Sequence, residues 1–103
     1  MEFKQLEMFV RLAEERSVQR TAERVFRTQA AVSMAITKLE DEARRPLFVR
    51  SRREPFRLTE TGKALYGYAK KLLALRDEAE ATLAGGVPSV EEEVARGEER
   101  QIR

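Results

Sequence analysis

The chain has 103 residues, carries a formal net charge of +2 and contains neither cysteine nor histidine. This length allows one small domain, alone or with an appendage, and the missing cysteines exclude a disulfide framework and a thiolate metal site. Because histidine is the commonest general base and metal ligand, its absence argues against an enzyme, and no cofactor is predicted.

Basic residues are concentrated in one part of the chain. Residues 16–57 contain eleven basic side chains and five acidic ones, a net charge of +6, whereas the segment from Val87 onward has a net charge of −2. This division suggests a polyanionic partner for one part of the chain only. A solvated basic surface explains the charge equally well, so charge alone does not choose between the two interpretations.

The first helix is predicted over Phe3–Glu15. Apolar residues recur there at spacings of three and four, which predicts a core helix with Phe3, Leu6 and Phe9 as packing residues. Residues 1–9 contain no apolar run flanked by basic residues, so a cytoplasmic protein without a membrane segment is expected.

A short second helix is predicted over Val18–Val25, with Ser17 as its N-cap. Ala22 lies on its inward side and is small enough for a following helix to cross closely. Phe26 and Arg27 then form a short connection that lacks the glycine often found in a helix-turn-helix. Many helical proteins contain such a pair, so this feature is not specific by itself.

The third helix is predicted over Arg27–Glu42, with Thr28 able to cap its N-terminus. Val32, Ile36 and Leu39 recur at the spacing of one buried helical face. The opposite face carries short or amide-bearing polar side chains with almost no negative charge: Gln29, Ser33, Thr37 and Lys38. Such a face suits a groove lined with hydrogen-bond donors and acceptors, so this segment is interpreted as the recognition helix of a helix-turn-helix.

A two-stranded wing is predicted after this helix, which ends before Pro46. The expected strands are Leu47–Arg50 and Phe56–Leu58, joined by the arginine-rich turn Ser51–Pro55. An ordinary hairpin is the alternative, but the guanidinium groups at the tip suit phosphate oxygens and favour phosphate contact.

A long helix is predicted over Glu60–Ala84, capped by Thr59. Its apolar stripe is longer than a winged domain can cover, and the helix is expected to leave that domain by about Lys70. The stripe therefore predicts pairing with a second copy of the chain. The expected interface comprises Leu65, Tyr68, Leu72, Leu75, Ala79 and Leu83. Packing of the stripe on the chain's own domain is the alternative, and it fits Leu65 and Tyr68 better than the residues from Leu75 to Leu83.

Gly85 and Gly86 are expected to end this helix. Three segments are therefore predicted: a winged helix-turn-helix over residues 1–58, a dimerisation helix over 59–84, and an acidic tail over 85–103. The tail is either a short helix opened by a capping box or a disordered segment, because it holds few large apolar residues.

The chain resembles the DNA-binding domain of the LysR-type bacterial transcriptional regulators over roughly residues 1–84. No single matching residue is specific to the family, but the order and spacing of the matching residues over about eighty positions form a specific signal. The residues that carry the resemblance are Leu6, Phe9, Ser17, Val18, Thr21, Ala22, Glu23, Arg24, the run from Arg27 to Ser33, Leu39, Glu40, Pro46, Leu47, Phe48, Arg50 and the run from Leu58 to Gly62.

The resemblance implies a mostly α winged helix-turn-helix followed by a linker helix that pairs antiparallel with its twin. Such a homodimer presents two recognition helices to two half-sites of double-stranded DNA. In these regulators the positions of Gln29, Ala30 and Ser33 face bases or phosphates.

This sequence departs from the family pattern in two respects. Met34 and Thr37 stand where Arg, Lys or Gln are frequent, which predicts apolar or hydroxyl contacts, such as one to a thymine methyl group. Family members usually continue into an effector-binding domain, whereas this sequence stops before one. No small-molecule effector is therefore expected on this chain. The sequence is consistent with either a fragment or a stand-alone DNA-binding module.

The predicted DNA-binding residues fall into two groups. One group binds phosphates and so fixes the register of the protein on the duplex without reading sequence, and the other group reads the bases. The expected base-facing residues are Gln29, Ala30, Ser33, Met34 and Thr37, and the expected phosphate-binding residues are Arg27, Thr28, Lys38, Arg50, Arg52 and Arg53. The rival interpretation is a protein–protein adaptor that uses the long helix, although an adaptor has no need of an arginine-tipped wing.

Overall fold

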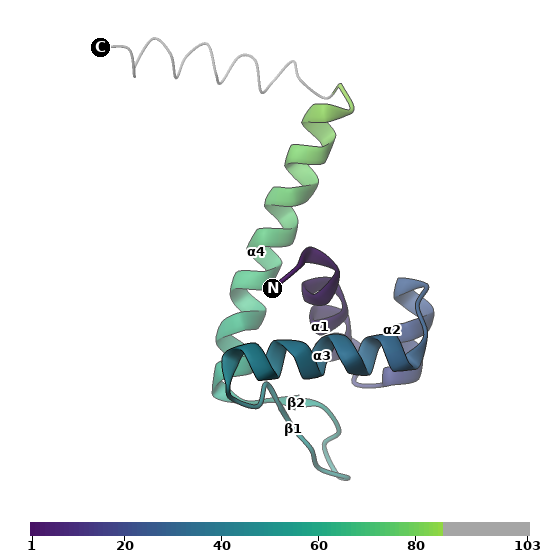
Figure 1. Cartoon of the computed structure of the whole chain (residues 1–103), viewed down its shortest axis with the longest axis vertical. Helices are drawn as coiled ribbons and strands as arrows, with labels where there is room; N and C mark the ends of the chain where they lie inside the picture. The colour runs from purple at the N-terminus through teal and green to yellow at the C-terminus, as the bar shows by residue number, and fades with distance from the viewer. Residues whose placement is uncertain (86–103) are drawn as a thin grey trace, which may run out of the picture. The chain divides into compact units, whose positions relative to one another are not determined.

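The computed structural model describes residues 1–85 and contains four helices and one two-stranded sheet within them (Figure 1). The chain divides into two compact units, Met1–Leu73 and Ala74–Arg103, which are described separately. The elements in chain order are α1 (Phe3–Glu15), α2 (Val18–Val25), α3 (Gln29–Ala43), β1 (Phe48–Val49), β2 (Arg57–Leu58) and α4 (Glu60–Leu83). The predicted mostly α winged helix-turn-helix followed by a long helix is confirmed.

Helix α1 supplies the centre of the first unit. Leu6, Phe9 and Leu12 are buried on one face, with no more than 2 % of any of them exposed. Phe3, in contrast, is 48 % exposed, so the expectation that it is a packing residue is wrong. The buried apolar stripe starts at Leu6, and Phe3 lies in the first turn of the helix, where about half of the residue is exposed.

The two helices that follow begin at the caps expected from the sequence. Ser17 Oγ accepts a hydrogen bond of 3.1 Å from the Arg20 amide, and Thr28 Oγ1 accepts one of 3.0 Å from the Ala31 amide. These side chains satisfy donors that helix geometry leaves without partners. Phe26 ends α2 with a left-handed φ of +57°, so an aromatic residue makes the turn that glycine often makes.

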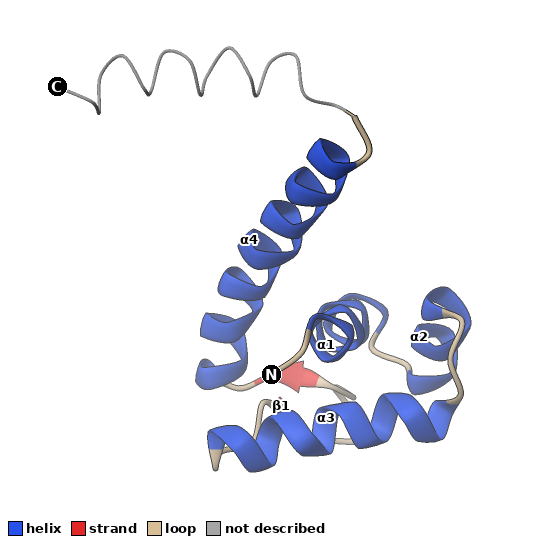
Figure 2. Ribbon diagram, turned by 45° about the horizontal axis from the view of Figure 1, so that its top comes forward, coloured by secondary structure: helices blue, strands red, loops and turns tan. Residues whose placement is uncertain are grey.

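The wing is an antiparallel pair in which Phe48 faces Leu58 and Val49 faces Arg57. Each strand has two residues in the ladder, fewer than the sequence predicted, because Leu47 and Arg50 lie just outside it. The Phe48 ring is buried and lies 5.4 Å from the Phe9 ring, centroid to centroid. The base of the wing is therefore part of the same core as α1 (Figure 2).

The first part of α4 is joined to the start of β1 through Thr59. Its hydroxyl donates to the Pro46 carbonyl at 2.8 Å and accepts from the Gly62 amide at 3.0 Å, which caps the helix. Gly62 is buried against the Leu47 carbonyl, where a Cβ atom would collide with the oxygen. Strand and helix can approach this closely because residue 62 has no side chain.

The first unit extends further along α4 than the sequence indicated. Ala69 is fully buried, and Leu65, Leu72 and Leu73 pack against the main core cluster. The expectation that the chain leaves the domain by about Lys70 is therefore wrong. Tyr68, which the alternative interpretation assigned to the domain interior, is 65 % exposed. The face of α4 that meets the core runs through 65, 69, 72 and 73, and Tyr68 lies outside it.

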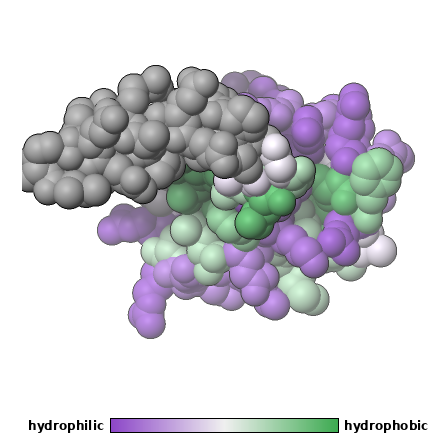
Figure 3. All heavy atoms as spheres, turned by 90° about the horizontal axis from the view of Figure 1, so that it is seen from above, coloured by the Kyte–Doolittle hydropathy of each residue, from purple (hydrophilic) through white to green (hydrophobic). Residues whose placement is uncertain are grey.

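The second unit begins with the last ten residues of α4. Leu75 and Leu83 are 60 % and 88 % exposed, and Ala79 is exposed as well. On the coloured part of the face seen in Figure 3, hydrophilic and apolar residues are intermixed. The acidic tail of the sequence prediction lies, from residue 86 onward, outside the described residues.

Candidate nucleic-acid interface

Helix α3 has one buried face and one exposed polar face. Val32, Ala35, Ile36 and Leu39 are buried against the rest of the unit. The exposed face contains every residue that the sequence assigned to base reading, together with the neighbouring Lys38: Gln29, Ala30, Ser33, Met34, Thr37 and Lys38. Burial of the opposite stripe orients this face outward, so it is available to a partner.

The N-terminus of α3 retains hydrogen-bonding capacity on its outer side. Thr28 Oγ1 accepts the Ala31 amide proton, and the hydroxyl proton of Thr28 therefore remains able to donate. The partial positive charge of the helix N-terminus favours an anion there. Arg27 precedes the cap and is exposed. The start of the helix is thus suited to a phosphate group.

The exposed face of α3 adjoins the base of the wing. A small recess of about 60 Å³ is lined by residues from both elements, among them Ser33, Thr37, Arg50 and Phe56. Three residues predicted to touch DNA, which are spread over eighteen positions in the sequence, therefore lie around one recess. This proximity makes the helix and the wing parts of one surface.

Glu40 connects α3 to the wing and was not among the predicted site residues. Its Oε2 accepts from the Leu47 amide at 2.8 Å and from the Phe48 amide at 3.4 Å, and its Oε1 accepts from Arg50 Nη2 at 3.2 Å. The Arg50 guanidinium also lies 5.4 Å from the centre of the Phe56 ring. Arg50, predicted to bind phosphate, is therefore held by Glu40 and Phe56.

Several other arginines of the basic segment are engaged within the unit. Glu15 pairs with Arg20 Nε at 3.5 Å and with Arg24 Nε at 3.4 Å. Arg16 Nε donates to the Pro55 carbonyl at 3.2 Å, and Arg57 pairs with Glu54 at 2.9 Å. These contacts direct the four arginines toward protein groups, which the charge count of the sequence could not reveal.

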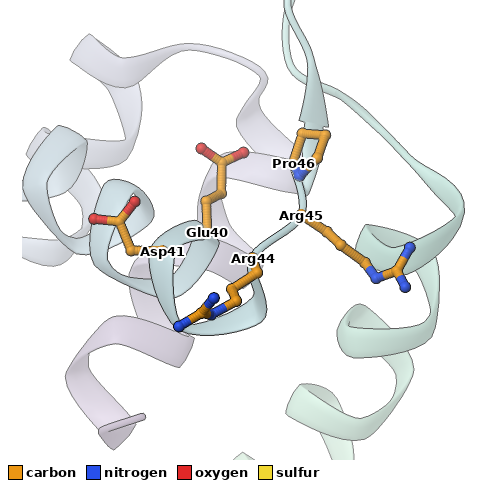
Figure 4. Close-up of a pocket in the computed structure, with 5 residues that line it drawn as sticks. All are labelled: Glu40, Asp41, Arg44, Arg45 and Pro46. Carbon is orange, nitrogen blue, oxygen red and sulfur yellow. The ribbon is translucent and has the colours of Figure 1, made fainter.

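The remaining cations of this segment have no ion pair or side-chain hydrogen bond within residues 1–85. Four of them are predicted phosphate-binding residues: Arg27, Lys38, Arg52 and Arg53. The sequence prediction omitted the other two, Arg44 and Arg45, which follow α3. They line a shallow hollow with Glu40, Asp41 and Pro46 (Figure 4). The only feature of the sequence that could have marked Arg44 and Arg45 as candidate phosphate-binding residues was that two basic residues are adjacent.

Two further properties of the described residues bear on function. None of their helices combines the length and apolar character that crossing a membrane requires. Among the same residues, no three carboxylate, thiol or imidazole side chains gather where they could hold a metal ion.

A short turn between two helices, an outward polar face on the second and an adjoining two-stranded wing define the winged helix-turn-helix class. Residues 3–63 match the profile of the bacterial regulatory helix-turn-helix proteins of the lysR family. Because the match covers more than half of the chain, this protein belongs to that family.

Two relatives illustrate the similarity of sequence. The HTH-type transcriptional regulator DgdR of Burkholderia cepacia is 42 % identical over 85 residues, which are 82 % of this chain and 29 % of DgdR. The HTH-type transcriptional regulator BudR of Klebsiella aerogenes is 43 % identical over 79 residues, covering 77 % of this chain and 54 % of BudR. The chain thus spans less than a third of the first relative and about half of the second.

Solved structures show the same fold. The BenM_DBD/benA site 1 DNA complex superposes with a TM-score of 0.74 at 32 % identity, covering 82 % of this chain and 96 % of the other. Vibrio fischeri DarR in complex with DNA also gives a TM-score of 0.74 at 32 % identity, over 82 % of this chain and 28 % of that one. Both proteins were solved with DNA.

Proposed function

We propose that this chain binds double-stranded DNA sequence-specifically, as the homodimeric DNA-binding part of a cytoplasmic transcription regulator. The observation that supports this most strongly is the outward polar face of α3 beside a wing whose tip carries Arg52 and Arg53, which have no ion pair with any other described residue. Membership of the lysR family and the DNA-bound relatives of the same fold support the same partner.

Base reading falls to the exposed face of α3. The width of the major groove of B-DNA admits one helix, and amide or hydroxyl side chains can pair with base edges there. Gln29 offers both a donor and an acceptor, and Ser33 and Thr37 offer hydroxyl groups. Ala30 and Met34 supply apolar contacts, for which the methyl group of thymine is a suitable partner.

Phosphate binding is assigned to Thr28 and to four exposed cations that have no ion pair or side-chain hydrogen bond within residues 1–85. Arg27 and Thr28 lie at the start of α3, Lys38 lies on its exposed side, and Arg52 and Arg53 lie in the wing turn. Arg50 is assigned a double role in this proposal, because its pairing with Glu40 leaves other donors of the guanidinium group free for a phosphate. Its first role is to hold the wing beside α3.

Dimerisation falls to α4, as the sequence pattern suggests. Tyr68, Leu75, Ala79 and Leu83 are exposed and recur at helical spacing, and a second copy of the chain would cover them. Leu65 and Leu72 pack on the core of their own unit, so their share of such an interface is smaller than the sequence implied.

A pair of variants tests the division between base and phosphate contacts. Gln29→Ala should cost about 1–3 kcal/mol on the preferred sequence and much less on random duplex DNA. Arg53→Ala should weaken binding to both by similar amounts and reduce the salt dependence. The preferred sequence is first obtained by selecting bound duplexes from a randomised pool. A change of sequence preference in Arg53→Ala would reverse the assigned roles.

Salt dependence decides whether DNA is the partner at all. We expect five to eight phosphates to be neutralised per half-site. Each such contact should contribute about −0.9 to the slope of log K against log salt concentration, where K is the association constant for duplex DNA. The rival function, a protein–protein adaptor, is favoured by one observation only, the exposure of Leu75 and Leu83. A salt-independent or undetectable affinity for duplex DNA would support the adaptor and overturn the proposal.

A further inference from the structure

The C-terminus of α3 contains an arginine in a backbone conformation that favours glycine. Arg44 is the C-cap of this helix and has φ +54° and ψ +32°, in the left-handed region. A Cβ atom is sterically disfavoured there, which is why glycine is the usual residue at such a position. The Arg44 amide closes the helix by donating to the carbonyls of Asp41 and Glu40. This termination requires the conformation but not an arginine side chain.

Two of the three other non-glycine residues in the left-handed region make a side-chain contact inside the protein, whereas the third, Phe26, is 91 % exposed. Arg16, with φ +58°, donates from Nε to the Pro55 carbonyl, and the Phe56 ring packs edge-on against Phe48 at 5.6 Å. Arg44 is exposed, and within residues 1–85 its guanidinium makes no ion pair or hydrogen bond. A stabilising contact inside this part of the protein therefore does not account for its identity.

The position of Arg44 continues the exposed face of α3. It follows Thr37 by seven residues, close to two helical turns, and so falls on nearly the same side as Ser33 and Thr37. The fifteen residues of α3 span about 22 Å, whereas the major groove is about 12 Å wide. If α3 crosses the groove with its start at the bases, its other end therefore lies at the rim of the groove, where the phosphates lie.

The C-terminus of a helix carries a partial negative charge, which repels a phosphate unless a cation lies there. Asp41 lies on the same side of the helix, and its carboxylate would repel a phosphate group. Figure 4 shows Asp41 and Arg44 on the same side of the hollow that they line, although no ion pair joins the two side chains. In the same view the Arg45 side chain extends to the opposite side.

We propose that Arg44 is a phosphate-binding residue at the groove rim and that the strained backbone at this position is retained for the sake of its guanidinium group. This inference rests on the proposed DNA-binding function and extends it from the N-terminus and the wing to the C-terminal end of the recognition helix. Recognition helix α3 is then held to the DNA backbone at both of its ends.

The test compares Arg44→Gly with Arg45→Gln, a matched removal of the neighbouring charge. Binding to a fluorescently labelled duplex of random sequence is measured by anisotropy over a series of salt concentrations, and melting temperature is measured in parallel. Arg44→Gly should melt at or above the temperature of the wild type, because glycine relieves the strain. Its affinity should fall roughly fivefold to tenfold per bound chain at about 0.1 M salt, with a slope smaller by about 0.9 for each chain bound.

The control variants distinguish this role from others. Arg45→Gln should leave the slope of the wild type unchanged, and Arg44→Lys should restore most of it because the charge is retained. An unchanged slope in Arg44→Gly, or a drop of equal size in Arg45→Gln, would overturn the inference while leaving DNA binding intact. A wild-type chain without salt-dependent binding would instead refute the proposed function itself.

Discussion

The Tyr66 hydroxyl donates a hydrogen bond of 2.8 Å to the Glu14 carboxylate, joining α4 to α1 across 52 positions of the sequence. Lys70 Nζ lies 3.4 Å from the same carboxylate oxygen. Partial burial acts to raise the pKa of Glu14, but the hydrogen bond from Tyr66 and the charges of Lys70 and Arg11 outweigh it, so this pKa lies below its usual value. The hydrogen bond to Glu14, with burial, raises the pKa of Tyr66.

We expect Tyr66→Phe to lower the free energy of unfolding near neutral pH by about 0.5–1 kcal/mol, a modest loss because the Glu14 side chain is 35 % exposed. A lowered folded-state pKa means that the Glu14 contribution is present above the unfolded-state pKa and is lost as pH falls through the folded-state value. The difference between variant and wild type should therefore shrink in acid. Urea denaturation at several pH values measures it.

Tyr68→Phe is the matched control for this experiment, because Tyr68 is 65 % exposed and its hydroxyl makes no hydrogen bond within the described residues. It should leave the free energy of unfolding unchanged at each pH of the same series. Equal losses in both variants would show that the hydroxyl of Tyr66 does not stabilise the contact between α1 and α4.

Two glycines of α4 should respond to alanine in opposite directions. A Cβ atom on Gly62 would overlap the Leu47 carbonyl oxygen, so Gly62→Ala must separate α4 from β1 and should cost roughly 1–3 kcal/mol. No other residue approaches within 4 Å of a Cβ atom on Gly67, so Gly67→Ala should stabilise by about 0.5–1 kcal/mol through helix propensity. Thermal melting of both variants checks the signs, and a stabilised Gly62→Ala would contradict the close approach.

Thr21 is the polar residue of the core that the structure leaves without a partner. It is fully buried, and its Oγ1 makes no hydrogen bond to another group in the described part of the chain. Thr21→Val replaces the hydroxyl by a methyl group of similar size and should raise the free energy of unfolding by about 1 kcal/mol. Denaturant titration of the purified variant measures this change.

Thr21→Ser provides the converse control, because it keeps the hydroxyl and removes the buried methyl group. It should lower the free energy of unfolding by about 1 kcal/mol. A destabilised Thr21→Val would show that the hydroxyl finds a hydrogen-bond partner in solution.

The dimerisation proposal is best tested at Leu75. Leu72 packs against the core, so an aspartate there would perturb the first unit as well as any interface. Leu75 is 60 % exposed, and burying such a side chain contributes about 1.5–3 kcal/mol. Leu75→Asp should therefore give monomers in sedimentation at concentrations where the wild type is dimeric, while the helical signal is kept. Tight binding to a site with two half-sites should be lost, because the second contact is no longer intramolecular.

Ala81→Asp adds the same charge on the opposite side of α4, at another exposed position. It should leave the sedimentation of the dimer unchanged. A dimeric Leu75→Asp variant would place the interface elsewhere, and the exposed Phe3 of α1 would be the next residue to test.

The amino-acid sequence by itself determined the order of the elements and, to within two residues, the limits of the helices. Helix ends depend on local hydrogen bonds, and the capping side chains Ser17, Thr28 and Thr59 make those bonds within a few residues. The exposed face of α3 was equally predictable, because helical periodicity separates it from Val32 and Ile36. Which of its residues touch bases stays a prediction.

Only the tertiary structure decided which arginines are free and how far the domain reaches. The charge count of the sequence treats Arg50 and Arg44 alike. In the structure, Arg50 pairs with Glu40, whereas Arg44 has no partner in the described residues. The difference arises because ion pairs depend on which residues folding brings together. Periodicity marks Leu72 as apolar without saying what covers it. In the structure, Leu72 is covered by the core of the first unit. It can reach this core because Gly62 lets α4 start close against β1.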